Sequence, residues 1–279
     1  MLVLYQAMIS IFAKPPFMLR HLQRVSSIVR GEQIAAYMGN ARLNPESGYE
    51  DDTCIYVKPN IKPGNDFKFE KNSWVDIQDG WDLIHTLKKY PEVGVIAYGD
   101  LAFETLSKEL TNKVVNIPHH HVNFERTLRK RDKIVKIGTT GSPAAWDYIP
   151  DVIKEGIKAR GLNLEMYSNF YPRTAVARFH ESVDVFIHWR PFLDRKLSCP
   201  FKIINAASFG VPTIALDEPS FKEVYGAYIG VETPEDWLKV LDELIANPDQ
   251  YDDMANDCIR ISEKYHISNI AKLYEELDK

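Results

Sequence analysis

Cysteine is scarce in this chain, and the cysteines that occur are widely spaced. Only three are present among 279 residues, Cys54, Cys199 and Cys258, and no two of them form a Cys-x-x-Cys pair. This number is too small for a disulfide framework or a cysteine-based zinc site, and it fits a protein of a reducing compartment. We therefore expect a cytoplasmic protein.

The chain also lacks an excess of positive charge. Its 34 Lys and Arg residues are outnumbered by 39 Asp and Glu, which gives a formal net charge of −5. This balance provides no global basic field for nonspecific binding of nucleic acid. A local basic face remains open, and the best cluster for one is Arg126, Arg129, Lys130 and Arg131.

The apolar segment at the start of the chain, residues 1–13, is too short to span a bilayer. Lys14, Pro15 and Pro16 follow it where the small-residue cleavage site of a signal peptide would lie. We interpret the segment as a buried first strand and expect no transmembrane segment. The alternative is an N-terminal face that touches a membrane.

Short β-rich runs alternate with longer helical patterns along most of the chain, whose hydrophobic fraction of 45% is ample for a packed core. The pattern predicts strands at residues 2–6, 54–57, 74–77, 93–98, 113–117, 133–138, 163–168, 183–188, 212–216 and 227–231. It predicts helices at residues 18–39, 81–90, 101–110, 143–160, 173–181, 201–209 and 234–246, followed by a helical C-terminal region. Residues 40–71 should be mostly loop around one strand.

Continuous apolar runs such as VDVFIH and VPTIAL are typical of strands covered on both faces, as in parallel sheets. Strands that alternate with helices imply βαβ units, and residues 122–131 separate two such series. We therefore predict the α/β class, with two doubly wound Rossmann-like domains at residues 1–122 and 132–279. The carboxyl ends of their strands should face a shared cleft, where ligands would bind.

A glycine-containing turn follows the predicted strand at residues 133–138. Gly138 and Gly141 allow close backbone approach, and Thr139 and Thr140 supply hydroxyl groups for an anionic ligand. The turn matches neither Gly-x-Gly-x-x-Gly nor the Walker A loop. A tight βα turn without a ligand is the alternative.

A basic loop follows the strand at residues 183–188. Its Ser-Cys-Pro sequence precedes a predicted helix and would expose backbone N–H groups beside several cations, a combination that suits a diphosphate. The candidate donor-binding residues here are Arg190, Arg195, Lys196, Ser198, Cys199, Phe201 and Lys202. The alternative is a solvated basic loop.

The run FKIINAASFGVPTIALDEPSFKEV, residues 201–224, resembles the donor-binding segment of GT-B glycosyltransferases of the group 1, family 4-like type. The preceding VDVFIHWRP is similar to their strand that ends in Pro. The run Ile-Pro-His-His at residues 117–120 resembles an interdomain segment of the same enzymes. The resemblance covers most of the C-terminal domain and more loosely the order of the N-terminal one.

The resemblance implies a nucleotide-sugar donor, with Asn205 and Glu223 in the donor-binding site. No metal cofactor is expected, because helix N–H groups and basic side chains can meet the charge of the leaving diphosphate. The resemblance also implies that His119 or His120 lines the cleft as catalytic base or sugar ligand, with a structural role as the alternative. The last helix is expected to cross back to the N-terminal domain, and residues 248–279 carry apolar positions that need a partner surface.

The chain departs from the family's pattern at several positions. Asn205 stands where many retaining members have the second of two glutamates, and Leu197 falls near the first. Thr139, Thr140 and Gly141 replace the usual Arg and Lys. These departures leave the stereochemistry open.

Two further motifs follow from residue types alone. Consecutive side chains of an extended chain point to opposite faces, so His119, His120 and His121 are not expected to share a metal ion. Asn169 and Phe170 follow the strand at residues 163–168 and could hold a nucleobase through the amide and the aromatic ring. Aromatic packing against the next helix is the alternative.

The expected function is the transfer of a sugar from a nucleoside diphosphate to an acceptor hydroxyl. The acceptors that we consider are a surface polysaccharide, a glycolipid or other lipid-linked sugar, and a modified base in phage DNA. One alternative is a sugar-nucleotide epimerase of the same fold. The other is a non-catalytic sugar-nucleotide binding module, since the glutamate positions are missing.

Overall fold

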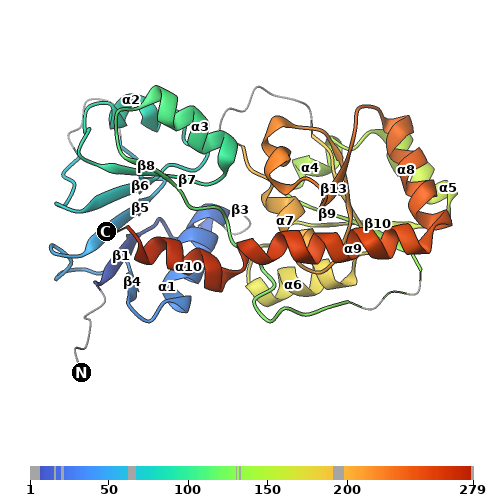
Figure 1. The fold of residues 1–279 in the computed structure, drawn as a ribbon, viewed down its shortest axis with the longest axis horizontal. Helices are drawn as coiled ribbons and strands as arrows, with labels where there is room; N and C mark the ends of the chain where they lie inside the picture. The colour runs from blue at the N-terminus through green and yellow to red at the C-terminus, as the bar shows by residue number, and fades with distance from the viewer. Residues whose placement is uncertain are drawn as a thin grey trace. The chain divides into compact units, whose positions relative to one another are not determined.

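A computed structural model describes residues 7–15, 17–19, 22–61, 67–129, 131, 133–190 and 198–277. The chain divides into two compact units (Figure 1). The first unit consists of Met1–His119, Lys196–Cys199 and Ile267–Lys279, and the second of His120–Arg195 and Pro200–His266. Each unit contains a parallel sheet with helices, as the alternation of strands and helices predicts.

The sheet of the first unit has six described strands, all parallel, in the order β4-β1-β5-β6-β7-β8. The strands are β1 Ile9–Phe12, β4 Ala41–Leu43, β5 Thr53–Val57, β6 Ser73–Asp76, β7 Gly94–Ala97 and β8 Val114–Asn116. The helical segments of this unit are η1 Ser27–Gln33, α1 Ile34–Tyr37, α2 Leu83–Leu87, α3 Asp100–Glu109 and α10 Ile267–Glu275. Strands β5, β6 and β7 are buried at every residue, which fits the lack of a strict alternation of apolar and polar residues in their sequences.

Close packing within this sheet requires a glycine at the start of β7. A Cβ atom at Gly94 would lie 2.2 Å from Cε3 of Trp74, which is opposite it on β6. The ring of Trp74 therefore covers Gly94 and fills the space that a side chain would occupy.

The sheet of the second unit has five described strands, all parallel, in the order β10-β9-β11-β12-β13. The strands are β9 Lys136–Thr140, β10 Asn163–Tyr167, β11 Val185–His188, β12 Thr213–Leu216 and β13 Tyr228–Val231. The helical segments are α4 Ala144–Asp147, α5 Asp151–Ala159, α6 Arg173–Ser182, α7 Phe201–Ala207, η2 Pro219–Val224, α8 Pro234–Ala246, α9 Pro248–Ser262 and η3 Glu263–Tyr265. Helices α5 and α8 pack side by side (Figure 1).

The strand order of the second sheet places a topological switch point between β9 and β11. The chain goes from β9 outward to β10 on one side and then returns to β11 on the other. In doubly wound sheets the loops at such a point diverge at the carboxyl ends of the strands and leave a crevice for a ligand. The residues that follow β9 and end β11 are therefore the first candidates for a site.

Three predicted elements differ from the structure. The helix predicted from residue 18 is wrong at its start, because β2 Phe17–Leu19 and β3 Leu22–Gln23 form an antiparallel pair there. The helix predicted at residues 143–160 is two helices, α4 and α5, separated at Pro150, which has no N–H to continue a helix. Strand β4 lies in a stretch predicted as loop, and the strand predicted at residues 2–6 lies outside the described residues.

The C-terminal segment contributes one helix to each unit. Helix α9 packs on α7 and α8 in the second unit, whereas α10 belongs to the first unit and packs on α1. Ile267 and Ile270 of α10 are buried, at 0% and 1% exposure. The apolar positions of α10 therefore find their partner surface in the first unit.

One buried histidine of the second unit has no polar partner in the part of the chain that the structure describes. His180 of α6 is 1% exposed, neither ring nitrogen has a hydrogen-bond partner there, and the rings of Phe179, Phe186 and Phe209 surround it. Burial disfavours the charged imidazole and lowers its pKa to about 3.

We expect this histidine to destabilise the fold in acid. Unfolded His180 takes up a proton near its ordinary pKa, but the folded protein resists protonation down to about pH 3. Between these values it lowers the unfolding free energy by up to ~1.4 kcal/mol per pH unit as the pH falls. Urea unfolding from pH 7 to 4 should therefore show a flatter pH dependence for His180→Leu. The same substitution at exposed His85 is the control, and equal slopes for wild type and His180→Leu would contradict the prediction.

Candidate functional site

The carboxyl end of β9 brings a glycine to the switch point of the second sheet. Gly141 follows the last residue of β9, and its N–H donates to the carbonyl oxygen of Tyr167 at the end of β10, at 3.2 Å. A Cβ atom at Gly141 would lie 2.6 Å from Cβ of Ala145 and 3.2 Å from Nζ of Lys202. Glycine therefore allows the lysine ammonium group to approach the turn closely.

Lys202 comes from a distant part of the sequence, the first turn of α7. The glycine turn and the basic helix start were predicted separately as anion-binding features, and the structure brings Gly141 and Lys202 together. An ammonium group beside a backbone turn is suited to an anionic group such as a phosphate.

Three more ionisable residues gather at the carboxyl ends of β11 and β12. Arg190, two residues beyond β11, makes two hydrogen bonds of 2.5 Å to the carboxylate of Glu218, through Nε and a terminal nitrogen. Nε2 of His188, the last residue of β11, lies 3.8 Å from Oε1 of Glu218. His188 and Glu218 are 5% and 7% exposed.

The electrostatics of this cluster fix its protonation at neutral pH. Burial alone would raise the pKa of Glu218, but the neighbouring imidazole and guanidinium groups lower it to about 2. Burial, assisted by the positive charges of Lys202 and Arg190, lowers the pKa of His188 to about 4. Glu218 is thus ionised and His188 neutral, and the cations Arg190 and Lys202 leave one positive charge in excess.

His188 and Glu218 are absent from the residues predicted from the sequence. A signal for both existed, since His188 ends a predicted strand and Glu218 lies two residues beyond β12. The carboxyl ends of neighbouring parallel strands lie at one edge of a sheet, which is where such sites form.

The structure gives Gly138 a packing role. It lies in the middle of β9, and a Cβ atom there would be 2.4 Å from Cγ2 of Val183. Thr139 and Thr140, predicted as turn residues, also belong to β9 and are 4% and 2% exposed. The strand extends two residues beyond its predicted end, so Gly141 is the turn glycine.

Asn205 already has a partner for its amide oxygen. The side chain is 4% exposed, and Oδ1 accepts a hydrogen bond from the N–H of Val122 at 2.9 Å. Its predicted place in the donor-binding site stays a prediction, and the hydrogen bond to Val122 occupies the oxygen in this structure. Glu223 lies on η2, half-buried, and its carbonyl oxygen accepts from Nζ of Lys264 at 3.1 Å.

The residues of the predicted phosphate loop are assigned to different units. Ser198, 6% exposed, and Cys199 belong to the first unit, where Cys199 packs against the apolar core. Phe201 and Lys202 begin α7 in the second unit. Arg195 and Lys196 lie outside the described residues.

The three consecutive histidines are buried. His119, 6% exposed, lies in the first unit with its ring 5.3 Å from that of Tyr98. His120 is fully buried in the second unit, and the ring of Phe124 lies 5.3 Å away. Burial holds the pKa of His121 well below its ordinary value. A catalytic role for His119 or His120 stays a prediction, and the described residues contain no cluster of three or more His, Cys, Asp or Glu side chains able to hold a metal.

In the loop after β10, Phe170 shows the aromatic packing that was the alternative to binding a nucleobase. Phe170 packs against the apolar cluster that contains Val176 and Phe179. Asn169 is exposed, and its Oδ1 accepts from the N–H of Tyr171 at 3.1 Å. Their role in holding a nucleobase stays a prediction.

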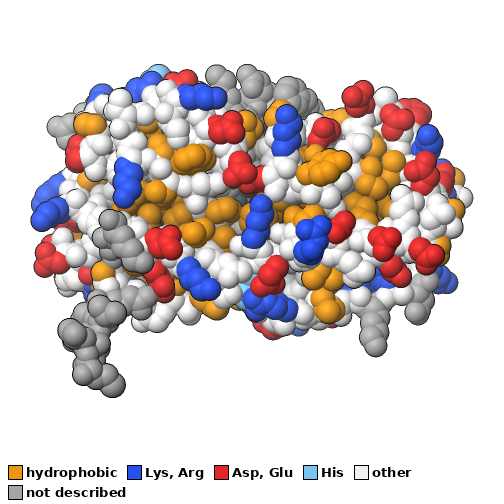
Figure 2. Space-filling view, viewed as in Figure 1, with side chains coloured by type: hydrophobic (Ala, Val, Ile, Leu, Met, Phe, Trp, Pro, Cys, Tyr) orange, Lys and Arg blue, Asp and Glu red, His pale blue; other side chains and the backbone are white. Residues whose placement is uncertain are grey.

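The described arginines of the basic cluster, Arg126, Arg129 and Arg131, form ion pairs or hydrogen bonds within the second unit. Arg126 pairs with Glu263 at 2.7 Å, Arg129 pairs with Asp184, and Arg131 donates to the carbonyl oxygens of Val183 and Gly210. Lys130 lies outside the described residues. On the face that Figure 2 shows, the described acidic and basic side chains are interspersed. These arginines thus have partners inside the protein.

No known protein family and no curated protein matches this chain by sequence. Its fold is similar to that of TarM, a GT-B glycosyltransferase, with a TM-score of 0.52 and 12% identity over 83% of this chain and 51% of TarM. It is also similar to the glycosylation associate protein (Gap123) complex from Streptococcus agalactiae, with a TM-score of 0.55 and 12% identity over 83% of this chain and 55% of that one. The chain thus spans about half the length of these structures.

Among the described residues, no helix is both long and apolar enough to cross a membrane.

The two parallel sheets and the likeness to these solved structures agree with the fold class predicted from the sequence. The chain has an α/β fold of the GT-B type, built from two Rossmann-like units.

Proposed function

We propose that the protein is a glycosyltransferase that moves a sugar from a nucleoside diphosphate to an acceptor hydroxyl. The observation that carries the proposal is the approach of the Lys202 ammonium to the Gly141 turn at the switch point of the second sheet. The likeness of the fold to GT-B structures supports it.

The reaction exchanges one bond at the anomeric carbon of the sugar. The bond to the diphosphate oxygen breaks, a bond to the acceptor oxygen forms, and the acceptor hydroxyl gives up its proton. Negative charge develops on the leaving diphosphate, and positive groups already in place stabilise it at little reorganisation cost. Lys202 would meet this charge directly, and Arg190, oriented by Glu218, would add to the positive potential.

The remaining assignments are part of the same proposal. Protein cations would take the place of a metal ion, and His119 or His120 would accept the acceptor proton. The acceptor would be a surface polysaccharide, a lipid-linked sugar or a modified DNA base. We place the reaction in the cytoplasm, in keeping with the few, scattered cysteines.

Incubation of the protein with nucleoside diphosphate sugars, monitored by ¹H and ³¹P NMR, tests the proposal. A transferase should consume its donor faster when acceptor is present, release nucleoside diphosphate and form a new glycosidic linkage. Conversion of the sugar without any acceptor would instead identify an epimerase. Saturable binding with no turnover on any of the acceptor classes would identify a binding module, and either result would overturn the proposal.

A further inference from the structure

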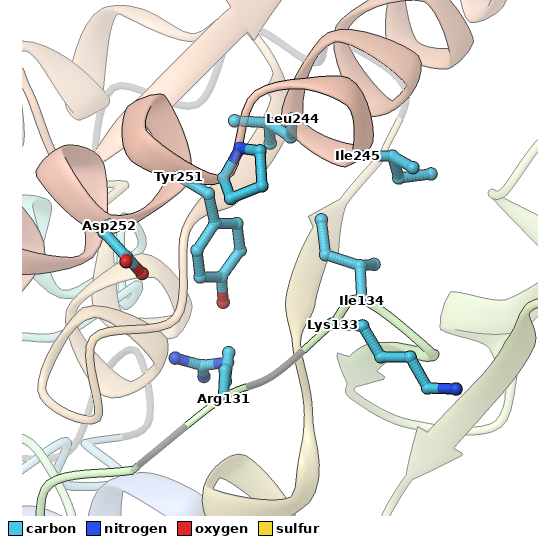
Figure 3. A pocket seen from close by; sticks show the side chains of 8 residues that line it. Arg131, Lys133, Ile134, Leu244, Ile245, Tyr251 and Asp252 are labelled. Carbon is cyan, nitrogen blue, oxygen red and sulfur yellow. The ribbon is translucent and has the colours of Figure 1, made fainter.

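A cavity of about 310 Å³ lies in the second unit, away from the cluster around Lys202. It lies between the segment that leads into β9 and the junction of α8 with α9 (Figure 3). The lining residues are Arg131, Lys133, Ile134, Leu244, Ile245, Pro248, Tyr251 and Asp252. Because Arg131, Lys133 and Ile134 precede β9, the cavity is at the amino edge of the sheet, whereas Gly141 and His188 are at the carboxyl edge.

Most of the cavity wall is apolar. Leu244 and Tyr251 are 2% and 5% exposed, and Ile245 is 42% exposed. Ile134 and Pro248 complete the apolar lining. The volume is at the lower end of the range of about 300–1,000 Å³ that is typical of sites for small organic molecules.

The polar side of the cavity carries positive charge that its neighbours only partly balance. Arg131, whose side chain is 7% exposed, and Arg129 both face the single buried carboxylate of Asp184. The terminal nitrogens of Arg131 donate to Gly210 and Val183, at 2.9 and 3.0 Å. Its buried Nε has no hydrogen-bond partner among the described residues and lies 3.6 Å from Oδ1 of Asp184.

The acidic groups next to the cavity do not cancel this charge. Asp184 also accepts hydrogen bonds from the N–H groups of Val135 and Lys136, so its carboxylate serves the start of β9 as well as two arginines. Lys133 is exposed and adds a further cation, against the one carboxylate of Asp252 in the lining. Among the described side chains, three cations, Arg129, Arg131 and Lys133, thus accompany two carboxylates, Asp184 and Asp252.

We propose that this cavity binds an amphipathic organic anion, with a carboxylate, sulfonate or phosphate group near Arg131 and Lys133 and an apolar body against Leu244, Ile245 and Ile134. The apolar wall contributes through burial of the ligand's hydrocarbon surface, and the cations select for a negative group. This site does not depend on the proposed transferase activity, because it uses none of the residues at the carboxyl edge.

Fluorescence titration of the full chain with 1-anilinonaphthalene-8-sulfonate, followed by competition with decanoate, tests the proposal. Ile245→Glu and Lys133→Glu place negative charge at two exposed lining positions, and we expect each to weaken dye binding by about tenfold or more. Val152→Glu and Lys239→Glu are the matched controls, since both positions are exposed, at 47% for Val152 and 75% for the side chain of Lys239, and neither lines the cavity. The controls should bind like the wild type.

The competitors separate the two parts of the proposal. Decanoate should displace the dye at lower concentration than decanol, which has the same chain length without the charge. Equal displacement by both would overturn the assignment of an anionic ligand. Dye binding that is absent, or equally strong in Ile245→Glu and the wild type, would overturn the site. Thermal unfolding monitored by circular dichroism confirms that each variant is folded.

Discussion

Lys202→Ala is expected to weaken the binding of a nucleoside diphosphate by about 10–100-fold and to leave binding of the nucleoside almost unchanged. The variant removes the ammonium group that lies beside the Gly141 turn. A hydrogen bond to a charged group contributes roughly 1.5–3 kcal/mol, and each 1.4 kcal/mol corresponds to about tenfold in affinity. Calorimetric titration with UDP and with uridine measures the two losses, and GDP with guanosine replaces this pair if the site prefers guanine.

Two further variants make the result specific. Lys222→Ala removes an exposed cation on η2 of the same unit and should leave both affinities unchanged. Lys202→Arg retains the positive charge and should recover part of the diphosphate affinity. Equal losses for the diphosphate and the nucleoside in Lys202→Ala would show that Lys202 does not contact the phosphates.

Asp76→Ala is expected to lower the unfolding free energy of the first unit by about 3–5 kcal/mol, the usual cost of leaving one partner of a buried ion pair uncompensated. Nε of Arg30 donates to Oδ2 of Asp76 at 2.6 Å, and both side chains are 0% exposed. Gln78 donates to the other carboxylate oxygen, and the guanidinium of Arg30 lies 5.3 Å from the centre of the Tyr274 ring. Urea unfolding measures the loss.

The double variant Arg30→Met/Asp76→Ala separates the charge effect from the loss of packing. Since it removes both charges, it should be less destabilised than Asp76→Ala alone. Lys88→Ala breaks the exposed pair with Glu109, 3.5 Å apart, and is the surface control, with an expected cost of at most about 1 kcal/mol. A double variant less stable than Asp76→Ala would show that the buried charge is not the source of the loss.

Local sequence signals predicted some elements closely. Helix α8 has its predicted bounds, because Thr233 accepts a hydrogen bond from the N–H of Asp236 and Pro234 occupies the first helical position. The prediction was wrong at residues 18–19 and 22–23, which belong to the paired strands β2 and β3 and not to a helix start. Pairing between strands depends on residues outside a local window, so periodicity alone misassigned this segment.

The sequence by itself determined the α/β class and the parallel character of the strands, and it predicted Gly141 and Lys202 as residues suited to an anion. Apolar runs and glycine turns are local features, which is why they could be interpreted without coordinates. Only the tertiary structure decided that Gly141 meets Lys202, that Glu218 joins Arg190 and His188, and that Val122 occupies the amide oxygen of Asn205. Each of these contacts joins segments that are far apart in the sequence, so no local pattern predicts them.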